Sequence, residues 1–283
     1  MKYIKLSLLA SFLIMLIMII TWGCRTQVIG RSAKEYAIEC EKIFGPLPNF
    51  SCDDAVDIPA TKNGVKLTHN SFKHNDCDRP FAFGEPCQSG NKVGRYTGIN
   101  SDGIENKDVI FITFCRDGGL GVIGYKFSTG QTCFLSINDY TDASNPSNLS
   151  HNNYNIDWMS PEVVANDGCQ NCHMASPFLH TPAIDQVMDP NNPNELLVPI
   201  TTNPNYYVIG KEFEQPHHNK ALKNSCTSCH RPQCTKHFEN YPLDELVMPP
   251  PFGSAHKIDN NTQSKKDREE IREWCKSLKL DKK

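Results

Sequence analysis

Cysteine is the residue that most constrains how this chain can fold, since it occurs thirteen times among 283 residues. Disulfides persist in oxidising compartments, whereas cytosolic cysteines stay reduced. The amino terminus indicates which compartment to expect. Lys2 and Lys5 precede an apolar run from Leu8 to Ile20, and Gly23-Cys24 follows it. A short basic region, an apolar stretch and a small-residue boundary are typical of a secretory signal.

The Gly23-Cys24 pair resembles the bacterial lipoprotein signal, in which the cysteine is lipidated and begins the mature protein. We therefore expect a signal peptide at 1–23 and a lipid anchor at Cys24 on the periplasmic side of a membrane. Thr21 and Trp22 depart from the usual flank, so ordinary cleavage or an uncleaved anchor are the alternatives. Loss of the two leader lysines changes the net charge from −3 to −5. That charge excludes an electrostatic attraction to nucleic acid.

Two CxxCH motifs contain four of the cysteines: Cys169-Gln-Asn-Cys172-His173 and Cys226-Thr-Ser-Cys229-His230. This pentapeptide is the attachment signature of c-type haem. Two thiols at this spacing can bond the two vinyl groups of one porphyrin, and the histidine that follows can bind the iron. The motifs predict two haem c groups with His173 and His230 as iron ligands. One zinc site shared by the two pairs, or a redox dithiol, are the alternatives.

Eight further cysteines remain once Cys24 is set aside as the lipid site, which predicts up to four disulfides. Sequence neighbours are the first expectation for their pairing. Cys115 with Cys133 would join the outer strands of a meander, and Cys234 with Cys275 would fasten the last helix. The eight are Cys40, Cys52, Cys77, Cys87, Cys115, Cys133, Cys234 and Cys275.

The fold class we expect is α+β: a small, disulfide-stapled, β-rich domain at 24–150, then a mainly α, loop-rich domain at 151–283. In the first domain, apolar runs at 108–115, 120–126 and 131–137 predict an antiparallel meander. Helical spacing predicts a helix over 32–44, and the composition of 46–107 predicts mostly loop.

In the second domain, a polar linker is expected at 141–157. Ser160-Pro161-Glu162 is a helix-start signature, and the helix should run into Cys169. Residues 189–205 should be loop. The chain should close with an amphipathic helix over 265–280, capped by Ser264 and Asp267.

Residues 160–280 resemble a dihaem c-type cytochrome. The second unit resembles class I cytochrome c, because Met248 stands in a Met-Pro loop before a helix that carries Trp274. The resemblance implies Met248 as the sixth ligand of the second haem, with His256 as the alternative. Met248 follows His230 by only 18 residues, which is shorter than the resemblance leads one to expect. For the first haem, His180 is the candidate contact, alongside Met188, His217 and His218.

The expected function is electron transfer between redox partner proteins of the cell envelope, with the lipid anchor holding the haems near the membrane. No catalytic residue beyond the haems is then needed. One alternative is a dihaem peroxidase-like oxidoreductase, in which one iron has an open position. The other is a haem-based sensor in which residues 24–150 bind a partner.

Overall fold

A computed structural model describes residues 30–81, 86–116, 118–138, 158–167, 169, 173, 176–201, 205–215 and 262–277. Several predicted site residues lie outside these ranges: Cys24, Cys172, Cys226, Cys229, His230 and Met248. The signal peptide and the pairing of Cys234 with Cys275 also lie outside what the structure describes. Within it, no helix has the length and apolar character that crossing a bilayer requires.

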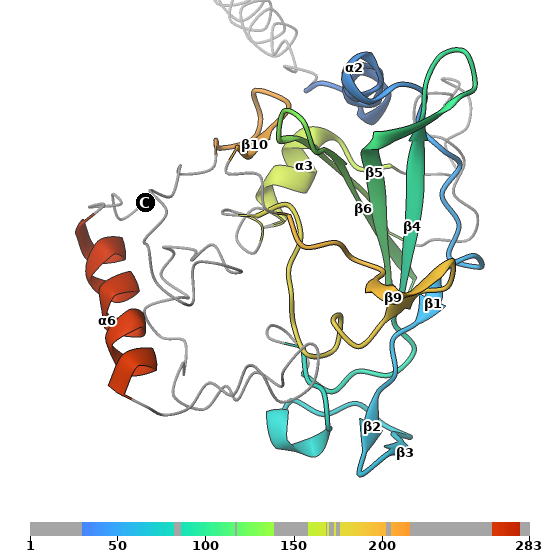
Figure 1. Cartoon of the computed structure of the whole chain (residues 1–283). Helices are drawn as coiled ribbons and strands as arrows, with labels where there is room; N and C mark the ends of the chain where they lie inside the picture. Colours follow the sequence, from blue (N-terminus) through green and yellow to red (C-terminus); the bar gives the residue numbers. More distant parts are fainter. Residues whose placement is uncertain are drawn as a thin grey trace, which may run out of the picture. The chain divides into compact units, whose positions relative to one another are not determined.

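A six-stranded sheet organises the described chain, in the order β1-β4-β5-β6-β7-β10 (Figure 1). Neighbouring strands from β1 to β7 are antiparallel, which confirms the predicted meander. The strands are β1 (Val56–Asp57), β4 (Lys92–Ile99), β5 (Glu105–Arg116), β6 (Gly119–Lys126), β7 (Gln131–Ile137) and β10 (Tyr207–Val208).

Both faces of this sheet are buried. Val109 and Phe111 of β5 belong to one hydrophobic core, together with the helix α2 (Ala33–Phe44). Ile110 and Ile112 belong to a second core with residues 178–198. Successive side chains of a strand point to opposite faces. A strand covered on both sides therefore appears in the sequence as a continuous apolar run, as β5 does.

Strand β4 corrects the expectation that 46–107 is mostly loop. It pairs with β5 along its length, with a register shift between Thr97 and Gly98. The local sequence conceals the strand because Gly94 and Gly98 weaken its β propensity. At Gly98 a Cβ would stand 2.6 Å from the Cβ of Val109, so close packing against β5 explains the glycine.

The outer edge of β7 is covered by chain from beyond residue 150. β10 pairs with it in parallel, and Trp158 forms a bridge to Ile137. Trp158, Val164 and Phe213 join the same core as α2. The two sides of the predicted 150/151 boundary therefore share a hydrophobic core. The β-rich part is confirmed, whereas the described residues of 151–283 form two helices among short strands rather than a mainly α domain.

The α-helices in the described residues are α2 (Ala33–Phe44), α3 (Pro161–Asn166) and α6 (Thr262–Ser277). Ser32 and Glu35 form a capping box at the start of α2, and Ser160 caps α3. α3 ends at Asn166, three residues before Cys169. α6 begins before Ser264, so the cap predicted from Ser264 and Asp267 is wrong.

The three disulfides that the structure describes are Cys40–Cys133, Cys52–Cys115 and Cys77–Cys87. Of these three, only Cys77–Cys87 joins sequence neighbours as expected, and the pairing of Cys115 with Cys133 was wrong. The register gives the reason, since Cys115 lies opposite Leu120 and Cys133 lies opposite Gly124, with β6 between their strands. Strands two apart are separated by about 10 Å, beyond the reach of one disulfide.

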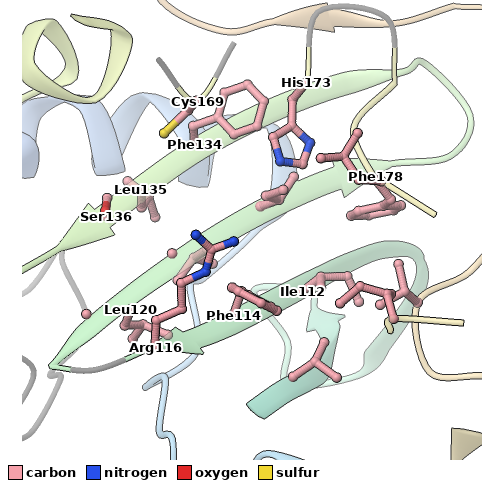
Figure 2. A pocket seen from close by; sticks show the side chains of 18 of the residues that line it. Ile112, Phe114, Arg116, Leu120, Phe134, Leu135, Ser136, Cys169, His173 and Phe178 are labelled. Carbon is pink, nitrogen blue, oxygen red and sulfur yellow. The ribbon is translucent and has the colours of Figure 1, made fainter. Parts of the chain in front are cut away.

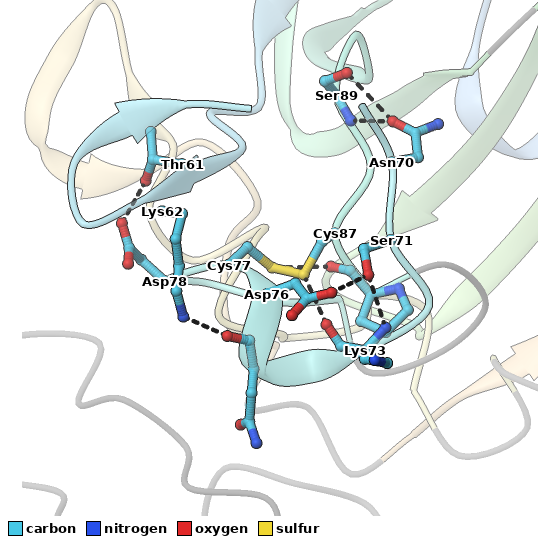
Figure 3. Close-up of a disulfide and its surroundings, with 12 residues drawn as sticks. Thr61, Lys62, Asn70, Ser71, Lys73, Asp76, Cys77, Asp78, Cys87 and Ser89 are labelled. Carbon is cyan, nitrogen blue, oxygen red and sulfur yellow. Dashed lines mark hydrogen bonds between the residues drawn. A yellow bond between two sulfur atoms is a disulfide. The ribbon is translucent and has the colours of Figure 1, made fainter. Parts of the chain in front are cut away.

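The Cys77–Cys87 disulfide joins a small loop region that includes the hairpin of β2 (Thr61–Lys62) and β3 (Val65–Lys66) and the 3₁₀ helix η1 (His74–Asp76) (Figure 3). The carboxylate of Asp78 accepts hydrogen bonds from the Thr61 hydroxyl at 2.8 Å and from the amides of Asn63 and Gly64 at 2.8 and 2.9 Å. A second hairpin, β8 (Met188–Asp189) with β9 (Asn192–Leu196), replaces the loop expected there.

Candidate functional site

A pocket of about 630 Å³ opens on the face of the sheet that residues 178–198 cover, and two residues of the first CxxCH motif line it (Figure 2). Cys169 and His173 reach it from the segment after α3. This volume lies within the range of about 300–1,000 Å³ typical of small-molecule and cofactor sites. Its lining is predominantly apolar, with the side chains of Ile112, Phe114, Ile123, Phe134, Phe178, Ile184 and Val198 among others.

The strand register builds the floor of the pocket. Phe114, Gly121 and Ser136 lie opposite one another on β5, β6 and β7, and Ile112, Ile123 and Phe134 form the next row. Residues paired in this way share one face of a sheet. A Cβ added at Gly121 would meet no atom within 4 Å. The glycine therefore leaves a hollow in the middle of the floor.

α3 and β7 position Cys169. Met159 donates a backbone hydrogen bond to Ser136 of β7 at 2.9 Å, and the buried Val164 anchors α3 in the core. Cys169 lies three residues after the end of α3 and packs against the same core. The predicted helix start at Ser160-Pro161 thus delivers the first motif cysteine to the pocket.

His173 is held from two sides. Its ring centroid lies 5.6 Å from that of Phe134, and its backbone carbonyl accepts a hydrogen bond from the hydroxyl of the buried Tyr206. Tyr206 directly precedes β10, so the strand that covers the edge of β7 also fixes the histidine backbone. The two contacts orient the imidazole in the pocket.

The His173 ring has a nitrogen that could bind a metal ion. Its Nδ1 atom is buried and has no hydrogen-bond partner among the described residues. Burial lowers the pKa of His173 to about 4. Backbone hydrogen bonds at Pro177 and Ser176 act in the opposite direction, and the charge of Arg116 adds to the lowering. The imidazole is therefore neutral near pH 7, which is the form that binds a metal.

His180 does not line this pocket, although its neighbours Leu179 and Thr181 do, and Met188 of β8 does not line it either. The His180 Nδ1 atom lies 2.7 Å from Asp185 Oδ1. Its Nε2 atom is buried without a partner among the described residues. A carboxylate on one ring nitrogen orients the other toward a ligand. Nowhere in the described chain do three His, Cys, Asp or Glu side chains gather as a metal cluster.

The first CxxCH motif points to Cys169 and His173, but no local pattern points to most of the residues that enclose them. Gly121, Phe134 and Arg116 belong to strands of the other half of the chain, and Tyr206 belongs to the far edge. The one local signal was the Gly119-x-Gly121 spacing on β6, which removes two side chains from one face of a strand. No protein-family model, curated protein or solved structure matches this chain.

Proposed function

We propose that the chain is an electron-transfer protein of the cell envelope that holds two covalent haem c groups. One would be bound through Cys169, Cys172 and His173, and the other through Cys226, Cys229 and His230. The single observation that carries the proposal is that Cys169 and His173 line one apolar pocket of about 630 Å³. A haem bound there supplies reversible one-electron chemistry at its iron.

The described residues fit a flat apolar cofactor with one metal atom. The hollow over Gly121 leaves room that a side chain would fill, and Ile112, Phe114 and Phe134 would exclude water. His173 offers a neutral imidazole without first releasing a proton. Cys169 and Cys172 would each add S–H across a vinyl C=C, forming an S–C bond while the hydrogen goes to the other vinyl carbon. No oxidant is consumed, so the whole mass of the haem is retained.

The β-rich half of the chain would supply the floor of the first haem pocket. Anchoring at Cys24 would keep both haems at the membrane surface, where redox partner proteins exchange electrons. Met248 is the proposed sixth ligand of the second iron, and His180, which does not line the pocket of the first haem, would contact the neighbouring haem. The Asp185 carboxylate, whose Oδ1 lies 2.7 Å from His180 Nδ1, would hold His180 in one tautomer. Carboxylates do the same for many metal-bound histidines.

The experiment is to express the full chain in cells that mature c-type haems and to measure intact mass and a pyridine haemochrome spectrum. Two haems should add about 1.2 kDa in total. Cys169→Ala with Cys172→Ala should remove half of that mass, and so should Cys226→Ala with Cys229→Ala. The matched control, Cys77→Ala with Cys87→Ala, removes a disulfide and should keep both haems. A colourless protein, or one that contains zinc, would refute the proposal.

Substitution of Gly121 tests the pocket itself. Gly121→Leu should fill the hollow and should perturb or prevent occupancy by the first haem, whereas Gly121→Ala adds one methyl group and should have little effect. Because glycine is the weakest strand former, neither change should destabilise β6. An unchanged absorption spectrum in Gly121→Leu would show that the pocket does not hold the haem.

The second candidate is peroxidase-like or small-molecule chemistry at the same pocket. Apart from His173, the described pocket lining has no histidine, methionine or lysine, while it does include Arg116. Low-spin spectra from both haems, with no reaction with cyanide or peroxide, would favour the electron carrier. A high-spin haem that binds cyanide and reacts with peroxide would favour the enzyme.

A further inference from the structure

Two large apolar side chains are displayed to solvent in the loop region that contains the Cys77–Cys87 disulfide. Phe72 is 76% exposed and Val65 of β3 is 69% exposed, more than any other large apolar residue of the described chain. Scattered apolar residues are ordinary on a protein surface, whereas a group of them indicates an interaction site. The position of these two residues relative to each other is therefore informative.

The β2–β3 hairpin and η1 are joined, which brings the two side chains to one place. The ammonium group of Lys62 donates a hydrogen bond to the backbone carbonyl of Asn75 in η1. Val65 lies directly opposite Lys62 in the hairpin, so the two side chains share one face. Phe72 stands two residues before the start of η1. Val65 and Phe72 therefore both lie beside the junction between the hairpin and η1.

Hydrogen bonds on both sides of Phe72 hold it in its exposed position. The Ser71 hydroxyl donates to the Asp76 carboxylate and accepts from the Lys73 amide at 3.2 Å (Figure 3). The Ser71 backbone exchanges two hydrogen bonds with that of Cys87, at 2.9 and 3.2 Å. An aromatic side chain fixed in water gains free energy when a partner removes it from water. The turn thus presents Phe72 for such a contact.

Positive charge surrounds these two side chains. Residues 61–79 contain four basic residues against two acidic ones, although the whole chain has a net charge of −3. The carboxylates of Asp76 and Asp78 accept hydrogen bonds within this region. Three of the basic residues are exposed lysines: Lys62, Lys66 and Lys73. Protruding apolar groups among lysines are typical of surfaces that bind anionic lipid, because the headgroups attract the lysines and the apolar groups enter the boundary with the acyl chains.

We propose that the surface formed by Val65, Phe72 and these three lysines docks on a bilayer that contains anionic phospholipid. The two apolar side chains would enter the boundary between headgroups and acyl chains, and the lysines would contact lipid phosphates. An anchor at Cys24 would keep this surface close to its bilayer, and to that extent the inference rests on the proposed function. It does not require either haem.

The test combines the full chain with vesicles and measures how deeply one introduced tryptophan enters the bilayer. Phe72→Trp keeps an aromatic side chain at the exposed position, and lipids brominated on their acyl chains quench a tryptophan that reaches them. Val163→Trp is the matched control, because Val163 is 43% exposed on α3, which packs against β7 at the side of the sheet away from β1. Vesicles of phosphatidylcholine alone are compared with vesicles that also contain phosphatidylglycerol, and the wild-type chain gives the background. Thermal unfolding establishes that each variant is folded.

Phe72→Trp should be quenched in vesicles that contain phosphatidylglycerol, whereas Val163→Trp should match the wild-type background. Adding Lys62→Gln, Lys66→Gln and Lys73→Gln to Phe72→Trp should remove most of the quenching. Salt at about 1 M should do the same, because it screens surface charge. Quenching that survives both changes would overturn the role of anionic lipid.

Intact mass separates this inference from the anchor. A lipidated chain that stays with the vesicles while Phe72→Trp is not quenched would overturn the docking surface and leave the anchor standing. Quenching of Phe72→Trp in a chain without lipid at Cys24 would support the surface and refute the anchor. If Phe72→Ser instead abolishes a concentration-dependent dimer and no quenching is seen, the surface joins two copies of the chain and the inference is overturned.

Discussion

The hydroxyl of Tyr206 donates a hydrogen bond to the backbone carbonyl of His173, 33 residues earlier in the chain. Tyr206 precedes β10, which pairs with β7, so this bond connects the edge of the sheet to the first CxxCH motif. Tyr206→Phe should cost about 1 kcal/mol, the typical net contribution of one such bond. It should also alter the spectrum of the first haem, because the backbone of its proposed ligand is released. Chemical denaturation and visible spectroscopy would measure the two effects. Tyr207→Phe, at an exposed neighbouring position, should change neither.

Gly130 allows β10 to reach β7. It has φ of +75°, and a Cβ there would lie 1.9 Å from the carbonyl oxygen of Asn205. Gly130→Ala should destabilise the protein by about 1–3 kcal/mol or more, since an unfavourable backbone conformation is combined with a clash. Amide exchange should accelerate at Tyr207 and Ile209, which donate to Gly130 and Thr132. Gly103→Ala is the matched control, because its φ of +83° carries the strain with no atom within 4 Å. Equal effects at the two glycines would contradict the role of close approach.

The Cys52–Cys115 disulfide encloses a sequence separation of 63 residues, against 10 for Cys77–Cys87. Cross-linking a longer loop restricts the unfolded chain more, and a native disulfide typically contributes about 2–4 kcal/mol. Replacing Cys52 and Cys115 with alanine should therefore lower the free energy of unfolding more than replacing Cys77 and Cys87. Urea denaturation of the two double variants provides the comparison. The opposite order would show that strain or unfolded-state structure outweighs loop length here.

Asp185 is expected to position His180 through the contact of 2.7 Å between Oδ1 and Nδ1. Asp185→Asn replaces a charge-assisted hydrogen bond, so a loss of about 1.5–3 kcal/mol is expected. If His180 is also an iron ligand, one haem should show a shifted low-spin spectrum. Asp189→Asn, a carboxylate of similar burial paired with Arg95, serves as the control. A stability loss without any spectral change would leave His180 with a structural role alone.

The Asp78 carboxylate should make the β2–β3 hairpin sensitive to acid. Hydrogen bonds from the Gly64 amide, the Thr61 hydroxyl and the Asn63 amide lower the pKa of Asp78 below its ordinary value. Because the folded pKa is the lower one, the stabilisation is present above the unfolded pKa and is lost as pH falls through the folded pKa. NMR titration should show Asp78 ionising below a free aspartate, with amide protection at Asn63 and Gly64 lost in parallel. In Asp78→Asn, that pH dependence should disappear.

Local patterns predicted the elements whose stabilisation is local. The apolar runs and turn residues of 108–137 predicted three strands, helical spacing predicted a helix over 32–44, and Ser160 predicted a helix start; the structure confirms each of them. β4 escaped prediction because its two glycines are explained only by contact with β5 and its surroundings. The partners of Cys115 and Cys133 escaped for a related reason, since pairing depends on which strands are neighbours. The two haem ligations at Cys226/Cys229/His230 and Cys169/Cys172/His173 stay predictions.

By itself, the sequence determined the chemistry that the chain carries: two CxxCH motifs, a set of further cysteines and the apolar strand runs of a meander. Those features depend on residues within a few positions of one another. Only the tertiary structure decided that Cys169 and His173 face Phe114, Gly121 and Phe134, which precede them by some 35 to 60 residues. The pocket forms where segments distant in sequence are packed against one face of the sheet. No local pattern records that packing, because it depends on the register and on the burial of the whole sheet.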